Sequence, residues 1–159
     1  MILILLSSII LLGYLGYILL KTKEIPNSIS ETYYNLNDNL KWIFRITLIL
    51  TPSLILPNWI EYSNDNIRFL IFLACSGMIF VGCSPELKIK QELKIHMVSA
   101  YISCGSAILW VILSKNILIL IVWIILGALG YLWKRKIIWW IEIITLGSIL
   151  TINLINSLL

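Results

Sequence analysis

Few residues in this sequence combine a reactive side chain with apolar surroundings. The one histidine, His96, and the acidic residue Glu142 both lie in or beside long apolar runs. A charge at the centre of a bilayer costs about 2.5–3.5 kcal/mol on insertion scales, so an ionisable group placed there needs a partner or a purpose. The chemistry open to these two groups is passage of a polar species or catalysis on a membrane-borne molecule.

Helical spacing places further polar residues on the same faces as these two groups. Residues that recur at steps of three or four share one face of an α-helix. Two polar stripes result, and their members are Glu142, Thr145, Asn153 and Asn156 on one helix and His96, Ser99 and Ser103 on another. Because polar stripes are costly against lipid, we expect both to point into a helix bundle, as a packed interface or as a polar pathway or ligand site.

Arg45 is a basic residue at a depth that matches Glu142. It lies four residues beyond Lys41 inside an apolar run, whereas Glu142 lies six residues beyond Lys136. One hypothesis is an ion pair between Arg45 and Glu142 within the membrane. The alternative is that the Arg45 side chain extends to the headgroups and leaves Glu142 to other partners.

The three cysteines offer little support for a metal or redox site. Cys75, Cys83 and Cys104 share no C-x-x-C spacing, and the sequence has no H-x-x-x-H pair. Cysteine is also a common small apolar filler in helix packing. We therefore expect no metal and no cofactor, and no P-loop, nucleophile elbow or dinucleotide fingerprint assigns a catalytic residue.

The elements that would position these side chains follow from composition. The chain has 159 residues, of which 60% are hydrophobic and 13% charged. A soluble domain of this size could not cover so much apolar surface with a polar coat. These values exclude a soluble enzyme, a disordered tail and a secreted disulfide scaffold.

Six apolar runs are long enough to cross a bilayer as helices. About 20 residues are needed, and the runs do not alternate as barrel strands would. The expected spans are about 2–20, 42–60, 67–85, 95–113, 117–133 and 137–158. The expected fold class is all-α, a polytopic six-transmembrane-helix bundle that forms a single membrane domain over residues 1–159.

The basic residues indicate an orientation. Nine of them fall in or beside the first, third and fifth connections, against Arg68 and Lys115 on the other side. By the positive-inside rule the basic loops face the cytoplasm of a bacterial cell, with both termini outside the cytoplasmic membrane. No basic cluster extends beyond a loop, so the expected partners are the lipid bilayer and a membrane protein or second copy, and no nucleic acid.

The longest connection, residues 21–41, carries its own pattern. Ser28 followed by Glu31 fits a capping box, which marks a helix start. Ile29, Tyr33, Leu36 and Leu40 then form one apolar stripe. We expect either a short amphipathic helix at the cytoplasmic interface or a prolongation of the second span into the headgroups. The segment would then rest on lipid or serve as a gate or a partner-docking surface.

Two segments together are similar to a known group. Residues 25–34 (IPNSISETYY) form one, and the other extends from Phe72 to Ala100 and includes FVGCSP and IHMVSA. They resemble small uncharacterised polytopic membrane proteins of Bacteroidetes and their phages. That group supplies no activity or catalytic residue, but the resemblance implies that Ser28, Glu31, Tyr33 and Tyr34, together with the His96 region, matter beyond topology.

Three functions are compatible with these patterns. The first is a non-catalytic assembly, regulatory or interaction component of the membrane. The second is a small transporter or channel with a polar path between spans four and six. The third is a membrane enzyme that acts on lipid or quinone through His96, Glu142 or a cysteine. No enzymatic activity is assigned.

Overall fold

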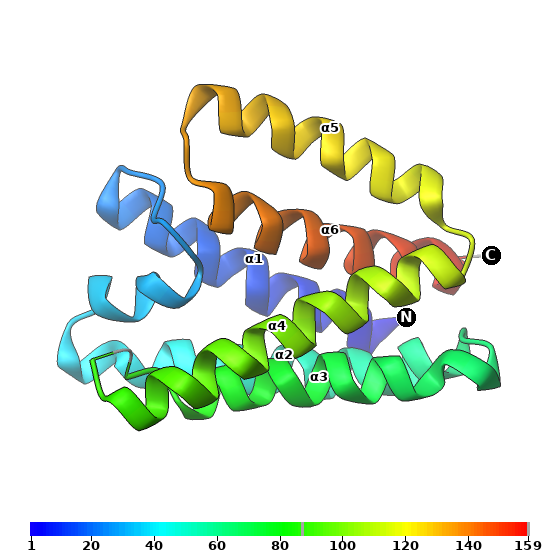
Figure 1. The fold of residues 1–159 in the computed structure, drawn as a ribbon, viewed down its shortest axis with the longest axis horizontal. Coiled ribbons are helices and arrows are strands. Elements are labelled where there is room, and N and C mark those ends of the chain that lie inside the picture. Colours follow the sequence, from blue (N-terminus) through cyan, green and yellow to red (C-terminus); the bar gives the residue numbers. More distant parts are fainter. Residues whose placement is uncertain (87, 159) are drawn as a thin grey trace.

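The apolar runs form helices arranged as a bundle in the computed structural model, which describes residues 1–86 and 88–158 (Figure 1). Within those residues the chain is helical and has no strand. The six α-helices are α1 (Ile2–Thr22), α2 (Lys41–Glu61), α3 (Arg68–Cys83), α4 (Lys90–Leu113), α5 (Ile117–Trp133) and α6 (Ile137–Leu158). The all-α expectation is confirmed, and each helix coincides with an expected apolar run. Five of the helical segments are long and apolar enough to cross a membrane, whereas α5 has 17 residues and is shorter.

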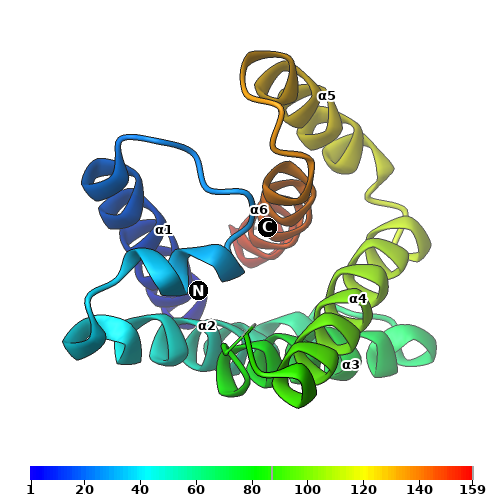
Figure 2. The same cartoon turned by 60° about the vertical axis from the view of Figure 1, so that its left-hand side comes forward.

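Successive helices run in opposite directions, so the bundle has two distinct ends. Both termini lie at one end, with the turns 62–67 and 114–116, and we call this the terminal end (Figure 1). The loop 23–40, residues 84–86 and 88–89, and the turn 134–136 lie at the other, which we call the basic end after its lysines and arginine (Figure 1). Helix α5 lies on the outside of the bundle against α6 (Figure 2).

Buried apolar side chains form two clusters, one toward each end. Toward the terminal end the cluster includes Ile4, Ile71, Ile152 and the edge-to-face pair Trp59 and Trp110. The cluster toward the basic end contains residues of α1, α2, α3 and α6 and also three from the first loop, namely Ile29, Tyr33 and Leu36. The first loop is therefore part of the core.

The most extensive helix contact joins α3 to α4. A Cβ atom on Gly77 would lie 2.6 Å from the carbonyl oxygen of Ser99, so only glycine allows this approach. Ser103 Oγ donates a 2.7 Å hydrogen bond to the carbonyl oxygen of Ala74. The serine stripe of α4 thus packs against α3, and α4 meets α6 over a shorter length.

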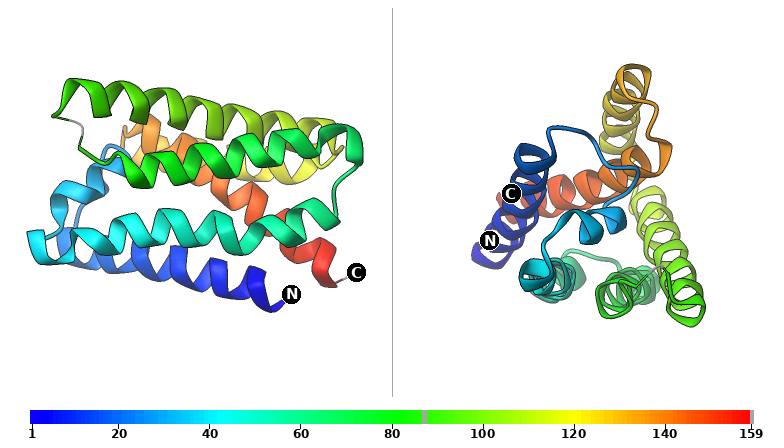
Figure 3. Two further views of the ribbon diagram at one scale, coloured as in Figure 1. Left: turned by 90° about the horizontal axis from the view of Figure 1, so that it is seen from below. Right: turned by 90° about the vertical axis from the view of Figure 1, so that its left-hand side faces the viewer.

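The expected amphipathic helix in the first loop is wrong in form and in place. Residues 30–40 form two short 3-10 helices, η1 (Ser30–Asn35) and η2 (Asp38–Leu40), separated by extended backbone at Leu36 and Asn37. Asparagine and aspartate side chains compete for backbone hydrogen bonds and disfavour a continuous helix. The apolar stripe is buried between α1, α2 and α6 rather than lying on the surface (Figure 3, right).

Candidate functional site

The candidate site is the part of the first loop that enters the basic end, residues 27–36, together with the cavity beneath it. We call these residues the inserted segment. Its backbone is bonded to α6 at two points: the Ile29 N–H donates to Oε2 of Glu142 at 2.5 Å, and the Asn27 carbonyl accepts from the N–H of Trp139 at 3.0 Å. Glu142 therefore satisfies a backbone donor that the loop leaves without a partner.

His96 of α4 binds the same segment through its ring. Its Nδ1 lies 2.9 Å from the carbonyl oxygen of Ser84, and its Nε2 lies 2.8 Å from Ser30 Oγ. A carbonyl oxygen only accepts, so Nδ1 carries a proton, and Nε2 is bonded to the Ser30 hydroxyl. The buried imidazole is bonded at both nitrogens to uncharged groups, and in the described part of the chain it forms no ion pair.

Helix α1 contributes a third contact through Tyr14. The Tyr14 hydroxyl lies 2.5 Å from Thr32 Oγ1, which itself donates to the carbonyl oxygen of Ile29. Because the Thr32 proton is used in that bond, the Tyr14 hydroxyl is the donor between the two side chains. Thr32 is fully buried, so this pair fixes the segment from inside.

Tyr33 connects the inserted segment to Arg45 of α2 and to Glu86, which follows α3. Its hydroxyl donates to Oε1 of Glu86 at 2.7 Å and accepts from Nη2 of Arg45 at 3.4 Å. Burial, and then the hydrogen bond to Glu86, raise the pKa of Tyr33, so the phenol stays protonated and keeps donating. The structure does not bring Arg45 to Glu142: no ion pair joins them within residues 1–86 and 88–158, and each has the partner named here.

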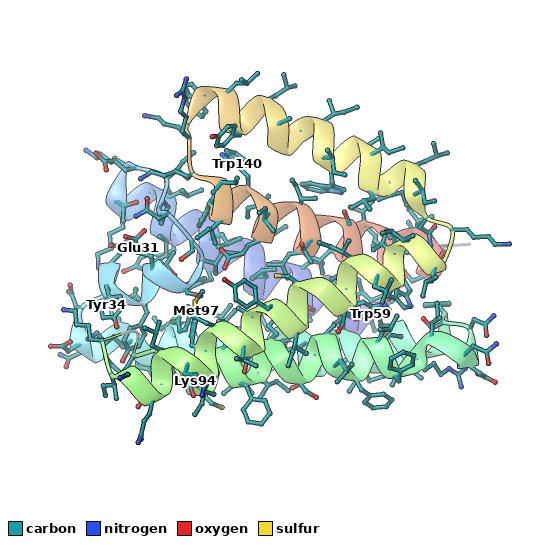
Figure 4. All side chains as sticks on the ribbon, in the orientation of Figure 1. Glu31, Tyr34, Trp59, Lys94, Met97 and Trp140 are labelled. Carbon is teal, nitrogen blue, oxygen red and sulfur yellow. The ribbon has the colours of Figure 1, made fainter. Side chains whose placement is uncertain are left out.

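The capping-box pair is formed in part. The Glu31 N–H donates to Ser28 Oγ at 3.1 Å, as that motif requires. The Glu31 carboxylate reaches the backbone N–H and the side-chain amide of Asn27 instead of the Ser28 backbone. Tyr34 lies with Glu31 at the basic end (Figure 4), and its buried hydroxyl has no hydrogen-bond partner among the described residues.

A central cavity extends from the inserted segment toward the terminal end. Its volume is about 80 Å³. One water needs about 10–15 Å³ of such space. Its walls are mainly apolar and come from α1, α2, α3, α4, α6 and the inserted segment. Its polar lining side chains include Ser30, Thr51, Ser103, Glu142 and Thr145.

Only some members of the two polar stripes line the cavity. Glu142, Thr145 and Ser103 line it, whereas Asn153 and Asn156 do not. Asn153 is fully buried, and its side-chain amide donates to the carbonyl oxygen of Ile149 in its own helix. The two stripes therefore approach each other at the basic half of the bundle and do not form a continuous polar path along α6.

Several residues of the site carry no signal in the sequence. Tyr14 and Glu86 bind the inserted segment, Thr32 is the residue of the segment that meets Tyr14, and Thr51 and Trp59 line the cavity. Serine, threonine and tyrosine in apolar runs are common, and their partners here are 18 to 66 positions away. Cys75 and Cys104 also line the cavity while Cys83 is exposed, and the described residues contain no group of three metal-ligating side chains.

Comparison with known proteins adds no assignment to this geometry. The similarity to membrane proteins of Bacteroidetes and their phages stays a prediction from the two quoted segments. No protein-family model, no curated protein and no solved structure matches this chain.

Proposed function

We propose that this chain is a six-span integral membrane protein of the bacterial cytoplasmic membrane that acts without catalysis, as a binding or regulatory component. The exposed apolar surface supports membrane insertion. On α5, Leu118 is 79% and Leu132 77% exposed, and Val122, Ile125 and Leu129 are exposed between them. Soluble proteins rarely present contiguous apolar patches larger than a few hundred Å² to water.

The count of six rests on connectivity. Helix α4 ends at the terminal end and α6 begins at the basic end, so α5 must cover the distance between the two ends (Figure 1). At 1.5 Å per residue its 17 residues extend about 26 Å, which is near the lower bound for a bilayer-crossing helix. If α4 and α6 cross the membrane, α5 crosses it too.

The distribution of charge supports placing the basic end in the cytoplasm. Nine lysines and arginines lie in or beside its loops, and Arg68 and Lys115 lie at the terminal end. The positive-inside rule then puts both termini outside. With this orientation the inserted segment closes the cytoplasmic side of the cavity.

One observation supports the non-catalytic assignment: the two side chains best suited to catalysis, His96 and Glu142, are bonded to the inserted segment. His96 has both ring nitrogens bonded to neutral partners, and Glu142 accepts a backbone N–H of the segment. A general acid or base needs a second reacting group within hydrogen-bond reach. These two side chains serve instead to keep residues 27–36 inside the bundle. Release of these residues would change what the protein can bind.

A second candidate function is a small transporter or channel, and the cavity next to Glu142 favours it. Flux through liposomes that contain the wild type or Glu142→Gln tests this candidate. Transport predicts a lower flux for the variant, since the substitution removes the charge and keeps the size. Equal flux from the two proteins would count against transport and in favour of the binding role.

Cysteine labelling tests the topology. Starting from a chain in which Cys75, Cys83 and Cys104 are replaced by alanine, we introduce Lys115→Cys or Arg135→Cys. A membrane-impermeant maleimide applied to whole cells is expected to label position 115 at once and position 135 only after permeabilisation. Labelling of position 135 in intact cells, or release of the chain from membranes by alkaline carbonate, would overturn the proposal.

A further inference from the structure

We infer that the basic end binds the phosphate group of an anionic phospholipid at Arg45, and that the bound lipid keeps the inserted segment in its place. The inference rests on the proposed membrane location, since the bilayer supplies the ligand. It names the ligand class and the regulation of the proposed binding component. The surface concerned consists of Lys41 and Arg45 of α2, Lys88 after α3 and the rings of Tyr33 and Tyr34, and we call it the cationic patch.

Two tyrosine rings of the inserted segment gather the three cations of the patch. Lys41 Nζ lies 4.9 Å and Arg45 Cζ 5.9 Å from the centre of the Tyr33 ring. Lys88 Nζ lies 5.4 Å from the centre of the Tyr34 ring, and the two rings pack edge-to-face at 5.3 Å. Three like charges are thus held around one aromatic pair, because each ring face attracts a cation.

The patch keeps a positive balance when its acidic neighbours are counted. Asp38 pairs with Lys41 at 2.8 Å, and Glu86 accepts a hydrogen bond from the Tyr33 hydroxyl. The three cations against these two carboxylates leave one positive charge. The start of α4, at the same end as Tyr34 (Figure 4), adds two lysines and one glutamate, which are Lys90, Lys94 and Glu92. An anion therefore fits this surface better than a zwitterion or a cation.

Arg45 reaches the level at which lipid phosphates lie. Its backbone is inside the apolar run, four residues past Lys41, yet its guanidinium approaches the same Tyr33 ring as the Lys41 ammonium. The side chain therefore extends back toward the membrane surface, as arginines near helix ends do. Arg45 is exposed and meets the Tyr33 hydroxyl only at 3.4 Å, so its planar fork of N–H donors is open to two oxygens of one phosphate.

The surface next to Arg45 fits the remainder of a lipid molecule. Trp42, Ile46 and Leu50 follow one another at steps of four residues, and all three are exposed on one face of α2. Tryptophan favours the headgroup level, and the two aliphatic side chains lie deeper, where acyl chains would contact them. A phosphate site that continues into an apolar stripe favours a phospholipid over a free phosphate.

The patch is complete only while the inserted segment is in place. Tyr33 and Tyr34 belong to the segment, so its withdrawal would remove both rings and the hydroxyl that Arg45 meets. A ligand that binds one state of an equilibrium more tightly shifts the equilibrium toward that state. Bound anionic lipid should therefore keep residues 27–36 inside the bundle, and its loss should favour their release.

Lipid binding to the purified full chain tests the site. Native mass spectrometry in detergent gives the dissociation constant of the first bound lipid, with phosphatidylglycerol as the ligand and phosphatidylcholine of the same acyl chains as the comparison. We expect phosphatidylglycerol to bind on the order of tenfold more tightly, and Arg45→Gln to remove this preference. Glycerophosphoglycerol, the same head group without acyl chains, should not displace the lipid, and displacement at equal concentration would contradict a lipid site.

Two variants separate a site at Arg45 from diffuse attraction to the basic end. Arg135→Gln removes one charge from another exposed arginine of that end, outside the patch, and should retain the preference for phosphatidylglycerol. Arg45→Lys keeps the charge but not the planar fork, so its affinity should lie between those of wild type and Arg45→Gln. Circular dichroism of each variant establishes that it is folded.

Hydrogen–deuterium exchange in nanodiscs tests the regulation. In wild type, phosphatidylglycerol at about ten times its half-saturating concentration should slow exchange of residues 27–36 by about tenfold relative to phosphatidylcholine alone. Arg45→Gln should show no such difference between the two lipid compositions.

Three results would overturn the inference. They are equal affinity for the two lipids, equal losses of affinity in Arg45→Gln and Arg135→Gln, and exchange in wild type that does not respond to phosphatidylglycerol. If the chain is retained in membranes and has the expected topology in any of these cases, the proposed function stands and only the lipid site fails. Extraction by carbonate would instead remove the proposed function.

Discussion

The two ends of the bundle are held by different kinds of interaction. At the basic end the bonds join residues far apart in sequence, as in Ser30 to His96 and Ile29 to Glu142, which are 66 and 113 positions apart. At the terminal end most bonds are local: Asn64 accepts from the N–H of Asn66, and Arg68 pairs with Asp65. The turns of the terminal end are thus held mainly by their own local bonds, whereas the inserted segment is bonded to side chains of four helices.

This difference implies that the two ends contribute differently to the stability of the bundle. The terminal end joins short turns to a tightly packed aromatic core, so changes there should lower the stability of the whole bundle. The inserted segment is held by a few polar contacts and short 3-10 helices, so changes there should open it locally.

The largest effect is expected from Trp110→Ala at the terminal end. Trp110 is 1% exposed, packs edge-to-face on Trp59 at 5.1 Å and donates to Ser63 Oγ. Removing a buried aromatic side chain leaves a cavity and costs about 3–5 kcal/mol in soluble proteins. We expect a loss of about 3 kcal/mol in global unfolding, measured by circular dichroism during titration of mixed micelles with a denaturing detergent. Trp133→Ala, at an exposed position, is the matched control and should change stability little. A similar loss in both variants would mean that the terminal core does not hold the bundle together.

At the basic end the largest effect is expected from Glu142→Leu. The substitution leaves the Ile29 N–H buried without an acceptor, which costs about 1–3 kcal/mol. Hydrogen–deuterium exchange of residues 27–36 should quicken on the order of tenfold or more. Global stability should change less than in Trp110→Ala.

The matched control for that experiment is Glu61→Leu, a change of the same kind at an exposed position of the terminal end. It should leave exchange in the inserted segment unaltered. Faster exchange throughout the bundle in Glu142→Leu would show that the two ends are not separable, and the comparison between them would fail.

A smaller effect is expected from Ser30→Ala. The variant removes one neutral hydrogen bond to His96, which is worth about 1 kcal/mol when the partner stays buried. Exchange in residues 27–36 should rise by about fivefold, less than in Glu142→Leu. Ser53→Ala, whose hydroxyl bonds only to its own helix at Ile49, should have no such effect. An unchanged exchange rate in Ser30→Ala would remove His96 from the contacts that hold the segment.

The same contrast explains what the sequence could and could not predict. Helix positions follow from uninterrupted apolar runs, and the turn at 114–116 follows from three residues between two such runs. The Ser28–Glu31 bond is local and was predictable as part of a capping box. The positions of Glu142 and His96 as inward-facing groups also follow from their helical phase.

The partners of these groups could not be predicted, because each bond depends on where a distant element lies. Arg45 and Glu142 match in depth along their helices, but depth says nothing about which loop lies between them. The stripe Ile29, Tyr33 and Leu36 correctly marked a buried face, and an amphipathic pattern does not distinguish burial against lipid from burial inside a bundle. That choice is made by polar contacts of Ser30 and Thr32, which lie between the apolar positions.

The smallest effect distinguishes the two turns that flank α5. Lys115, in the turn between α4 and α5, has φ of 62°, a left-handed conformation that costs a residue with a Cβ more than it costs glycine. Lys115→Gly should therefore raise global stability by about 0.5 kcal/mol in the same micelle titration. Lys134, which ends α5 at the basic end, has φ of −135°, an extended conformation that any residue adopts. Lys134→Gly should give no gain and a small loss from the greater freedom of the unfolded chain. If both variants are stabilised or both destabilised, backbone conformation at these two residues does not determine the effect of the substitution. The stability of the turn at Lys115 must then come from the core that it joins.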